Sequence, residues 1–120
     1  MPDPSIIDPQ AIESLRALNP DDNDEFLREI AGIFLEDTPL RVAELVQSLN
    51  AGDIGKFTRA AHSIKGSSAN LGATTLRAVA EKLEHQSRKE GLAGAGPLVD
   101  DIKREFNRAE TELRKLIAAK

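Results

Sequence analysis

The spacing of the apolar residues is the feature that most constrains the fold of this chain. They recur three and four positions apart along almost the whole sequence, which is the period of an α-helix. No convincing run alternates apolar and polar residues as a half-buried strand would, and no Asn-Gly hairpin signal occurs. The pattern therefore predicts an all-α protein.

Capping residues, glycines and prolines predict where the helices begin and end. A short first helix should open at Asp8-Pro9, because Asp can cap free N–H groups and Pro suits the first helical position, and should end at Asn19-Pro20. Four longer helices are expected over about 24–51, 53–71, 74–90 and 97–116, with glycines at the ends of the first three. Within the first of these, Pro39 predicts a kink or a restart capped by Thr38.

Each predicted helix carries an apolar stripe, which predicts how the helices pack. In the second helix the expected stripe begins with Phe26, Ile30, Ile33 and Phe34. Four long amphipathic segments with short connections, preceded by a leader helix, are typical of an antiparallel, up-and-down four-helix bundle. We expect residues 1–120 to form one such domain, monomeric because its stripes can satisfy one another within one chain.

Composition excludes several functional classes. The net charge of −4 and the absence of Trp and Tyr argue against nucleic acid as the main partner. With no Cys, the chain lacks disulfides, thiolate nucleophiles and Cys-ligated zinc. Neither a signal peptide nor an apolar run long enough to span a membrane is read from the sequence. We expect a soluble cytoplasmic domain without metal or cofactor, too small to include a nucleotide-binding catalytic domain.

The segment around His62 carries the chemistry. If Phe57 is placed at the centre of the buried face, a rotation of about 100° per residue brings Ile64 and Ser68 close to that face. His62 then lies near ~140° and Gly66 near ~180°, both toward solvent, with Lys65 at the border near ~80°. A mid-helix glycine one turn from an exposed imidazole removes side-chain bulk beside it.

His62, Lys65, Gly66 and Gly72 have the spacing of the histidine-containing phosphotransfer (HPt) domain motif, and the chain resembles that family over nearly its whole length. The resemblance implies that His62 accepts a phosphoryl group from the phospho-aspartate of a receiver domain and passes it to another receiver. It implies partners among response-regulator receivers or hybrid sensor histidine kinases, with magnesium on the partner alone. The chain itself would be a phosphocarrier without an autonomous catalytic site, and Lys65 would stabilise phosphoryl charge.

Further residues receive supporting roles. Gly66, Ser67, Arg59 and Ala69 are expected at the docking surface. Gly72 and Ser68 are assigned to structure, with Ser68 bonding back to the Ile64 carbonyl. Some family members place a polar side chain of the next helix beside the phosphorylated His, and Glu84 is the candidate here. His85 and the run Arg88-Lys89-Glu90 are expected to be solvated surface.

Three other functions also use helical chains of this kind. The dimerisation helices of sensor kinases usually place an acidic residue directly after the His, whereas Ser63 follows here. A carboxylate-bridged metal bundle would need Glu three residues before each His, but Arg59 and Lys82 occupy those positions. The alternative that remains is an HPt-like helical module that docks a receiver or another signalling protein without carrying phosphate.

Overall fold

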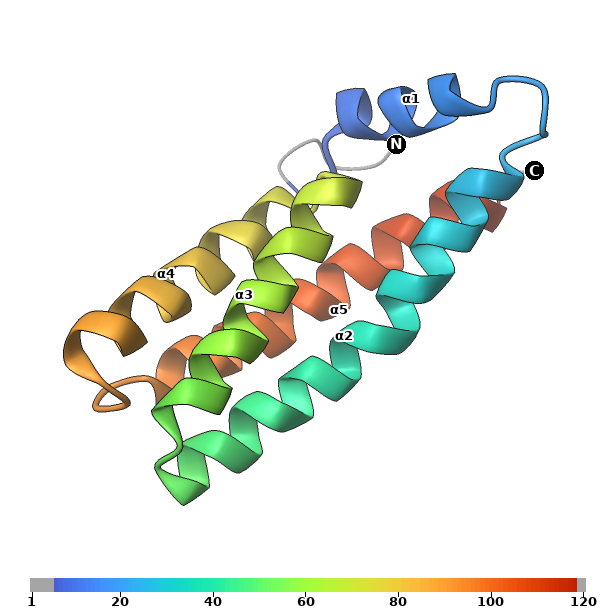
Figure 1. The fold of residues 1–120 in the computed structure, drawn as a ribbon. Helices are drawn as coiled ribbons and strands as arrows, with labels where there is room; N and C mark the ends of the chain where they lie inside the picture. The colour runs from blue at the N-terminus through green and yellow to red at the C-terminus, as the bar shows by residue number, and fades with distance from the viewer. Residues whose placement is uncertain (1–5, 119–120) are drawn as a thin grey trace.

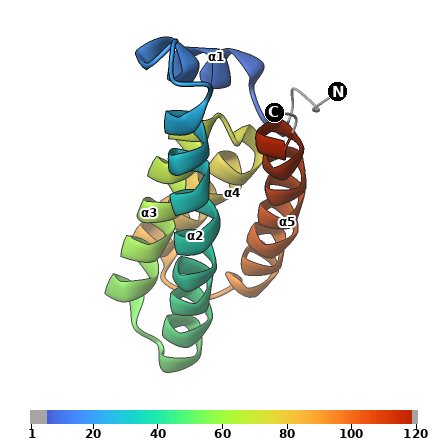
Figure 2. The same cartoon turned by 90° about the vertical axis from the view of Figure 1, so that its right-hand side faces the viewer.

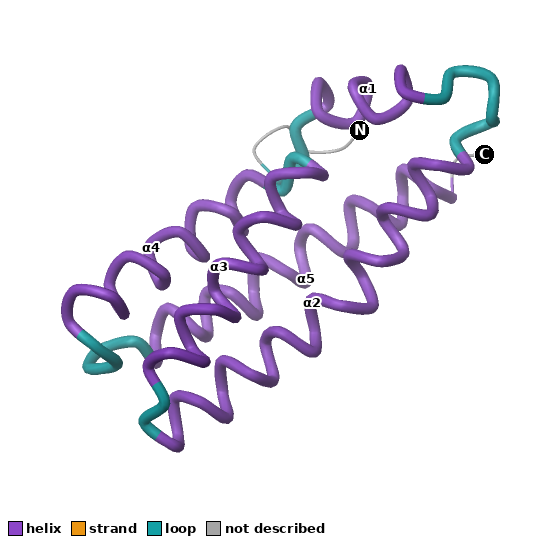
Figure 3. The backbone as a smooth tube through the Cα atoms, viewed as in Figure 1, coloured by secondary structure: helices purple, strands orange, loops and turns teal. Residues whose placement is uncertain are grey.

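The computed structural model describes residues 6–118, and within that range the chain is helical without strands, which confirms the all-α prediction. In chain order the helices are α1 (Pro9–Leu18), α2 (Glu25–Ala51), α3 (Ile54–Leu71), α4 (Thr74–Glu90) and α5 (Gly96–Ala118). The four longer helices lie alongside one another, and α1 lies across one end of them (Figures 1 and 2). The short loops between successive long helices, shown in Figure 3, make those neighbours run in opposite directions.

The helix ends follow the capping residues read from the sequence. Asp8 and Asp53 are the N-caps of α1 and α3, and each side chain accepts a hydrogen bond from a backbone N–H in the first turn. Gly52 and Gly72 close α2 and α3 in the left-handed conformation, with φ of 71° and 69°. The limits of α3 and α4 agree with those predicted.

Pro39 lies inside α2, at the point where the sequence predicts either a kink or a restart capped by Thr38. The helix continues through this proline, so a restart capped by Thr38 is wrong. Thr38 is buried and its Oγ1 has no hydrogen-bond partner within residues 6–118, so its hydroxyl caps no helix there. Phe34 and Leu45, on either side, are both buried, and this packing outweighs the single backbone hydrogen bond that Pro39 cannot make.

The buried face of α2 also differs from the predicted stripe. Of the four predicted residues only Phe34 is fully buried, whereas Ile33 is 57% exposed. The inward face is completed by Leu27, Ala31 and Thr38. Because this face includes Ala31 and Thr38, a stripe predicted from the large apolar residues alone does not match it.

The core lies between α2, α3, α4 and α5. Phe34 of α2 meets Phe106 of α5 with ring centroids 5.7 Å apart. Helix α5 contributes one apolar face, on which Ile102, Ala109 and Leu113 are fully buried. The core thus holds α3 and α4 side by side, and the candidate site lies where these two helices meet.

Gly72 joins α1 to the rest of the fold. The Asp8 N–H donates to the Gly72 carbonyl at 2.8 Å, which brings the start of α1 onto the end of α3. A Cβ atom on Gly72 would lie 2.6 Å from the Cβ of Ala11. Both this close approach and the positive φ require glycine at position 72.

Candidate functional site

His62 lies in the middle of α3 and points outward. Its neighbours Ala61 and Ile64 are fully buried, whereas the His62 side chain is 63% exposed. The amphipathic pattern of α3 therefore places the imidazole at the surface, as the spacing predicts.

Glu84 of α4 lies directly against this imidazole. Its Oε2 is 2.8 Å from His62 Nδ1 although the Glu84 side chain is only 4% exposed. Glu84 follows Leu83, which is buried in the core. Glu84 therefore lies at the edge of the apolar face of α4, where its side chain is buried but its carboxylate still contacts the exposed histidine.

Two cations share the same carboxylate. Lys65 Nζ lies 2.6 Å from Oε1, and an Arg88 side-chain nitrogen lies 2.8 Å from Oε2. Burial favours the neutral form of Glu84, but the hydrogen bonds and charges of Lys65 and His62 outweigh it and hold the pKa of Glu84 below its ordinary value. Glu84 is therefore ionised at neutral pH.

The ionised carboxylate determines the tautomer of His62. A carboxylate can only accept hydrogen bonds, so the proton lies on Nδ1, which donates to Glu84. In the neutral ring the lone pair is then on Nε2, at the side of the imidazole away from Glu84. This arrangement offers an oriented, solvent-accessible nitrogen nucleophile.

Lys65, predicted to stabilise phosphoryl charge, is already engaged with Glu84. Lys65 contacts Oε1 of Glu84, whereas His62 contacts the other carboxylate oxygen, Oε2. The structure thus brings His62, Lys65 and Glu84 together.

The residues expected at the docking surface lie around the imidazole on α3. Gly66, Arg59 and Ala69 are exposed, and a Cβ added to Gly66 would meet no atom within 4 Å. Ser67 is half-buried, and its Oγ donates to the Ser63 carbonyl at 3.1 Å. The surface beside His62 is therefore open at Gly66.

The hydrogen bond predicted from Ser68 to the Ile64 carbonyl is absent, and that prediction is wrong. Ser68 is fully buried, and its Oγ has no hydrogen-bond partner among the residues that the structure describes. Ser67 makes this contact instead, with its Oγ 3.3 Å from the Ile64 carbonyl.

Sequence reasoning missed Arg88, which it assigned to a solvated face. Arg88 is 64% exposed, but it binds Glu84 and borders an open hollow of about 550 Å³ that His62 and Arg59 also line. The available signal was its position four residues after Glu84, the spacing of a helical ion pair.

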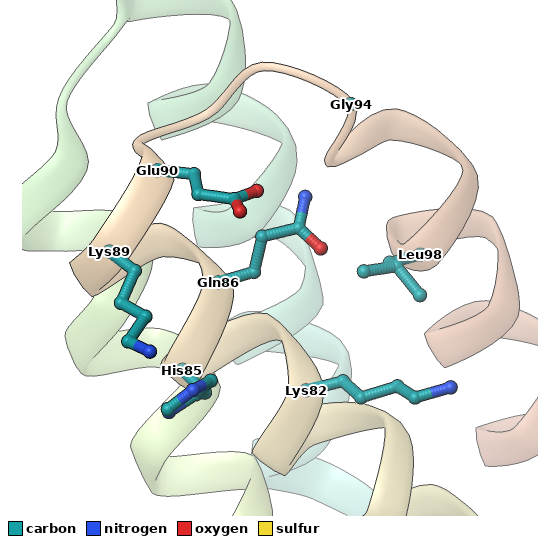
Figure 4. A pocket seen from close by; sticks show the side chains of 7 residues that line it. All are labelled: Lys82, His85, Gln86, Lys89, Glu90, Gly94 and Leu98. Atoms are coloured by element: carbon teal, nitrogen blue, oxygen red, sulfur yellow. The ribbon is translucent and has the colours of Figure 1, made fainter.

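The second histidine, His85, lies on the outer side of α4. It is exposed and borders a different hollow, of about 510 Å³, together with Lys82 and Lys89 (Figure 4). Within residues 6–118, no carboxylate orients its ring through a hydrogen bond or ion pair in the way that Glu84 orients His62.

Among residues 6–118, no three His, Asp or Glu side chains are grouped so that they could hold a metal ion. No helix formed by the same residues is long and apolar enough to cross a membrane.

Comparison with known proteins gives both family and structural relatives. The model of the Hpt domain family matches residues 29–119. Multistep phosphorelay regulator 1 of Schizosaccharomyces pombe is 34% identical over 83 residues, which are 69% of this chain but only 28% of that protein, so the chain spans little more than a quarter of this relative.

Two solved structures extend the comparison. Histidine-containing phosphotransfer protein B from Pseudomonas aeruginosa superposes with a TM-score of 0.87 at 28% identity, covering 96% of both chains. The maize phosphotransfer protein ZmHP2 gives a TM-score of 0.83 at 20% identity, covering 95% of this chain and 84% of its own, and supports the fold alone.

Proposed function

This chain belongs to the Hpt domain family, the histidine phosphotransfer domains of phosphorelays, and we propose that His62 is its phosphoacceptor. In this proposal a receiver phospho-aspartate transfers its phosphoryl group to Nε2 of His62, which later passes it to a second receiver. The observation that carries the proposal is the exposed imidazole whose Nδ1 is held by the buried, ionised Glu84.

The contacts of His62 suit each bond change of this step. The lone pair of Nε2 attacks phosphorus, the P–N bond forms, and the P–O bond breaks so that the receiver aspartate leaves as a carboxylate. Nδ1 keeps its proton, so the ring acquires positive charge as the P–N bond forms. Glu84, 2.8 Å away, stabilises that charge without having to reorient.

Lys65 and Arg88 would balance the charge of the phosphoryl group. Together they carry two positive charges beside the single negative charge of Glu84. Arg88 is exposed at the surface, so it would turn from Glu84 toward phosphoryl oxygens, which its guanidinium suits in geometry. Phosphoryl transfer depends mainly on such positioning and charge stabilisation.

The domain would act as a carrier whose partners supply the remaining chemistry. We propose that its partners are receiver domains, in response regulators or hybrid kinases, and that magnesium and the catalytic aspartate belong to them. We also propose a single domain over 1–120, built as an antiparallel four-helix bundle of α2 to α5 with α1 as leader helix. It would act as a cytoplasmic monomer without a cofactor of its own.

Incubation with a phosphorylated receiver, followed by detection of acid-labile label on this chain, tests the proposal. His62→Gln should lose the label, whereas His85→Gln, the matched control on another exposed surface, should retain it. Both variants should keep their helicity, because exposed side chains contribute little to stability. Receiver binding without any label on the wild-type chain would instead favour the module that docks without carrying phosphate.

A further inference from the structure

Two buried hydroxyl groups join α3 to α4 near the candidate site. Thr58 Oγ1 and Ser87 Oγ lie 2.7 Å apart, and both residues are buried. Ser87 Oγ also donates to the Glu84 carbonyl at 3.1 Å, which uses its only hydrogen. The Thr58 hydroxyl must therefore be the donor to Ser87, and the hydrogen bonds run from α3 through Ser87 to the backbone of Glu84.

This hydrogen bond is the neighbour of the contact between His62 and Glu84. Thr58 precedes His62 by four residues on α3, and Ser87 follows Glu84 by three on α4. Because the two helices run in opposite directions, the two pairs form adjacent cross-links about one helical turn apart. The Thr58–Ser87 pair lies inside, and the His62–Glu84 pair lies at the surface.

The chemistry of the pair suits it to fixing the register of the two helices. Apolar contacts hold α3 and α4 together but have no preferred direction. A hydrogen bond is restricted in both length and angle, so it resists sliding of one helix along the other. Thr and Ser are also weaker helix formers than the apolar residues these inward positions could carry, which favours a specific role for their hydroxyls.

We propose that Thr58 and Ser87 are positioning residues for phosphotransfer. Their hydrogen bond sets the register of α3 against α4, so that the Glu84 carboxylate meets Nδ1 and leaves Nε2 as the acceptor nitrogen. This inference rests on the proposed function of His62.

Thr58→Val tests the proposal, because valine keeps the shape of threonine and removes the hydroxyl. Thr58→Ser keeps the donor and serves as the conservative rescue. Thr38→Val is the matched control: it makes the same change at a buried threonine of α2 whose Oγ1 has no hydrogen-bond partner. Ser87→Ala removes the acceptor and serves as a second test if Thr58→Val does not fold.

Two measurements are made on every folded variant. Nitrogen NMR of the unphosphorylated domain reports which ring nitrogen of His62 carries the proton, and the rate of transfer from a phosphorylated receiver reports the chemistry. In Thr58→Val and Ser87→Ala we expect mixed tautomers and transfer slower by about tenfold or more, since a misplacement of about 1 Å can cost roughly a hundredfold. Thr58→Ser and Thr38→Val should match the wild-type chain in both measurements.

A wild-type tautomer and transfer rate in Thr58→Val or Ser87→Ala would overturn the positioning role. The same losses in Thr38→Val would also overturn it, since they would show a general effect of removing a buried hydroxyl. The NMR measurement needs no phosphotransfer, so it tests the positioning role independently of the proposed function. Persistence of the label in His62→Gln would refute the proposed function by itself.

Discussion

Gly66→Ala should stabilise the domain while impairing its function. Gly66 lies in the interior of α3, and a Cβ placed there would meet no atom within 4 Å. The change therefore creates neither new packing nor a clash, and the difference in helix propensity remains, about 0.8–1 kcal/mol in favour of alanine. For a domain of this size we expect the melting temperature to rise by about 4 °C.

The same methyl group should slow phosphotransfer. Gly66 is one turn from His62 on the exposed side of α3, where the rim of a receiver active site would approach. A side chain at position 66 would separate the partner from the imidazole. We expect Gly66→Ala to transfer more slowly than the wild-type chain, and Gly66→Arg to remain folded but lose nearly all transfer.

Gly32→Ala is the matched control, because Gly32 also lies inside a helix and an added Cβ would likewise meet no atom within 4 Å. It should raise the melting temperature by a similar amount and leave transfer unchanged. Thermal melting by circular dichroism and receiver-to-domain transfer, measured on the same samples, check both effects. Wild-type transfer by Gly66→Arg would show that the partner does not approach over this face.

Three further predictions follow from the site and from the caps. Lys65→Ala and Arg88→Met should each slow transfer in a kinetic assay without abolishing it, because each removes one cation and leaves the nucleophile. The pKa of Glu84 is lower in the folded state than its ordinary value of 4.5, so ionised Glu84 stabilises the fold at pH values above 4.5, and this contribution is lost as pH falls through the folded-state pKa. In Glu84→Gln the free energy of unfolding, measured against pH, should therefore fall less steeply in acid. Gly72→Ala should cost at least about 2 kcal/mol in denaturant unfolding, whereas Gly52→Ala, with similar φ and no close neighbour, should cost about 1 kcal/mol.

The helices could be predicted from the sequence because their ends are marked locally. Asp53 and Gly72 fix the limits of α3 through groups within a few residues of the helix ends. The inward face of α2 could not be predicted in the same way. Ala31 and Thr38 are buried there because of the helices packed against them, and Ile33 is left exposed although it is strongly apolar.

The features of the site also differ in how far the sequence predicts them. The outward position of His62 and the open surface at Gly66 follow from the period of one helix. The contact with Glu84, 22 residues away, depends on how α4 lies against α3. The Thr58–Ser87 hydrogen bond depends on the same register, which no local pattern contains. The ion pair of Arg88 with Glu84 is different, because its spacing of four residues within α4 is visible in the sequence.

The most direct test of the central claim is to identify the phosphorylated atom. The ¹⁵N-labelled domain, phosphorylated by a receiver, can be examined by NMR for the ring nitrogen that shows coupling to phosphorus. Because Glu84 holds the proton on Nδ1, the phosphoryl group should be on Nε2 of His62, with Nδ1 still protonated and bonded to Glu84. Phosphorus on Nδ1 of His62, or on His85, would contradict the account.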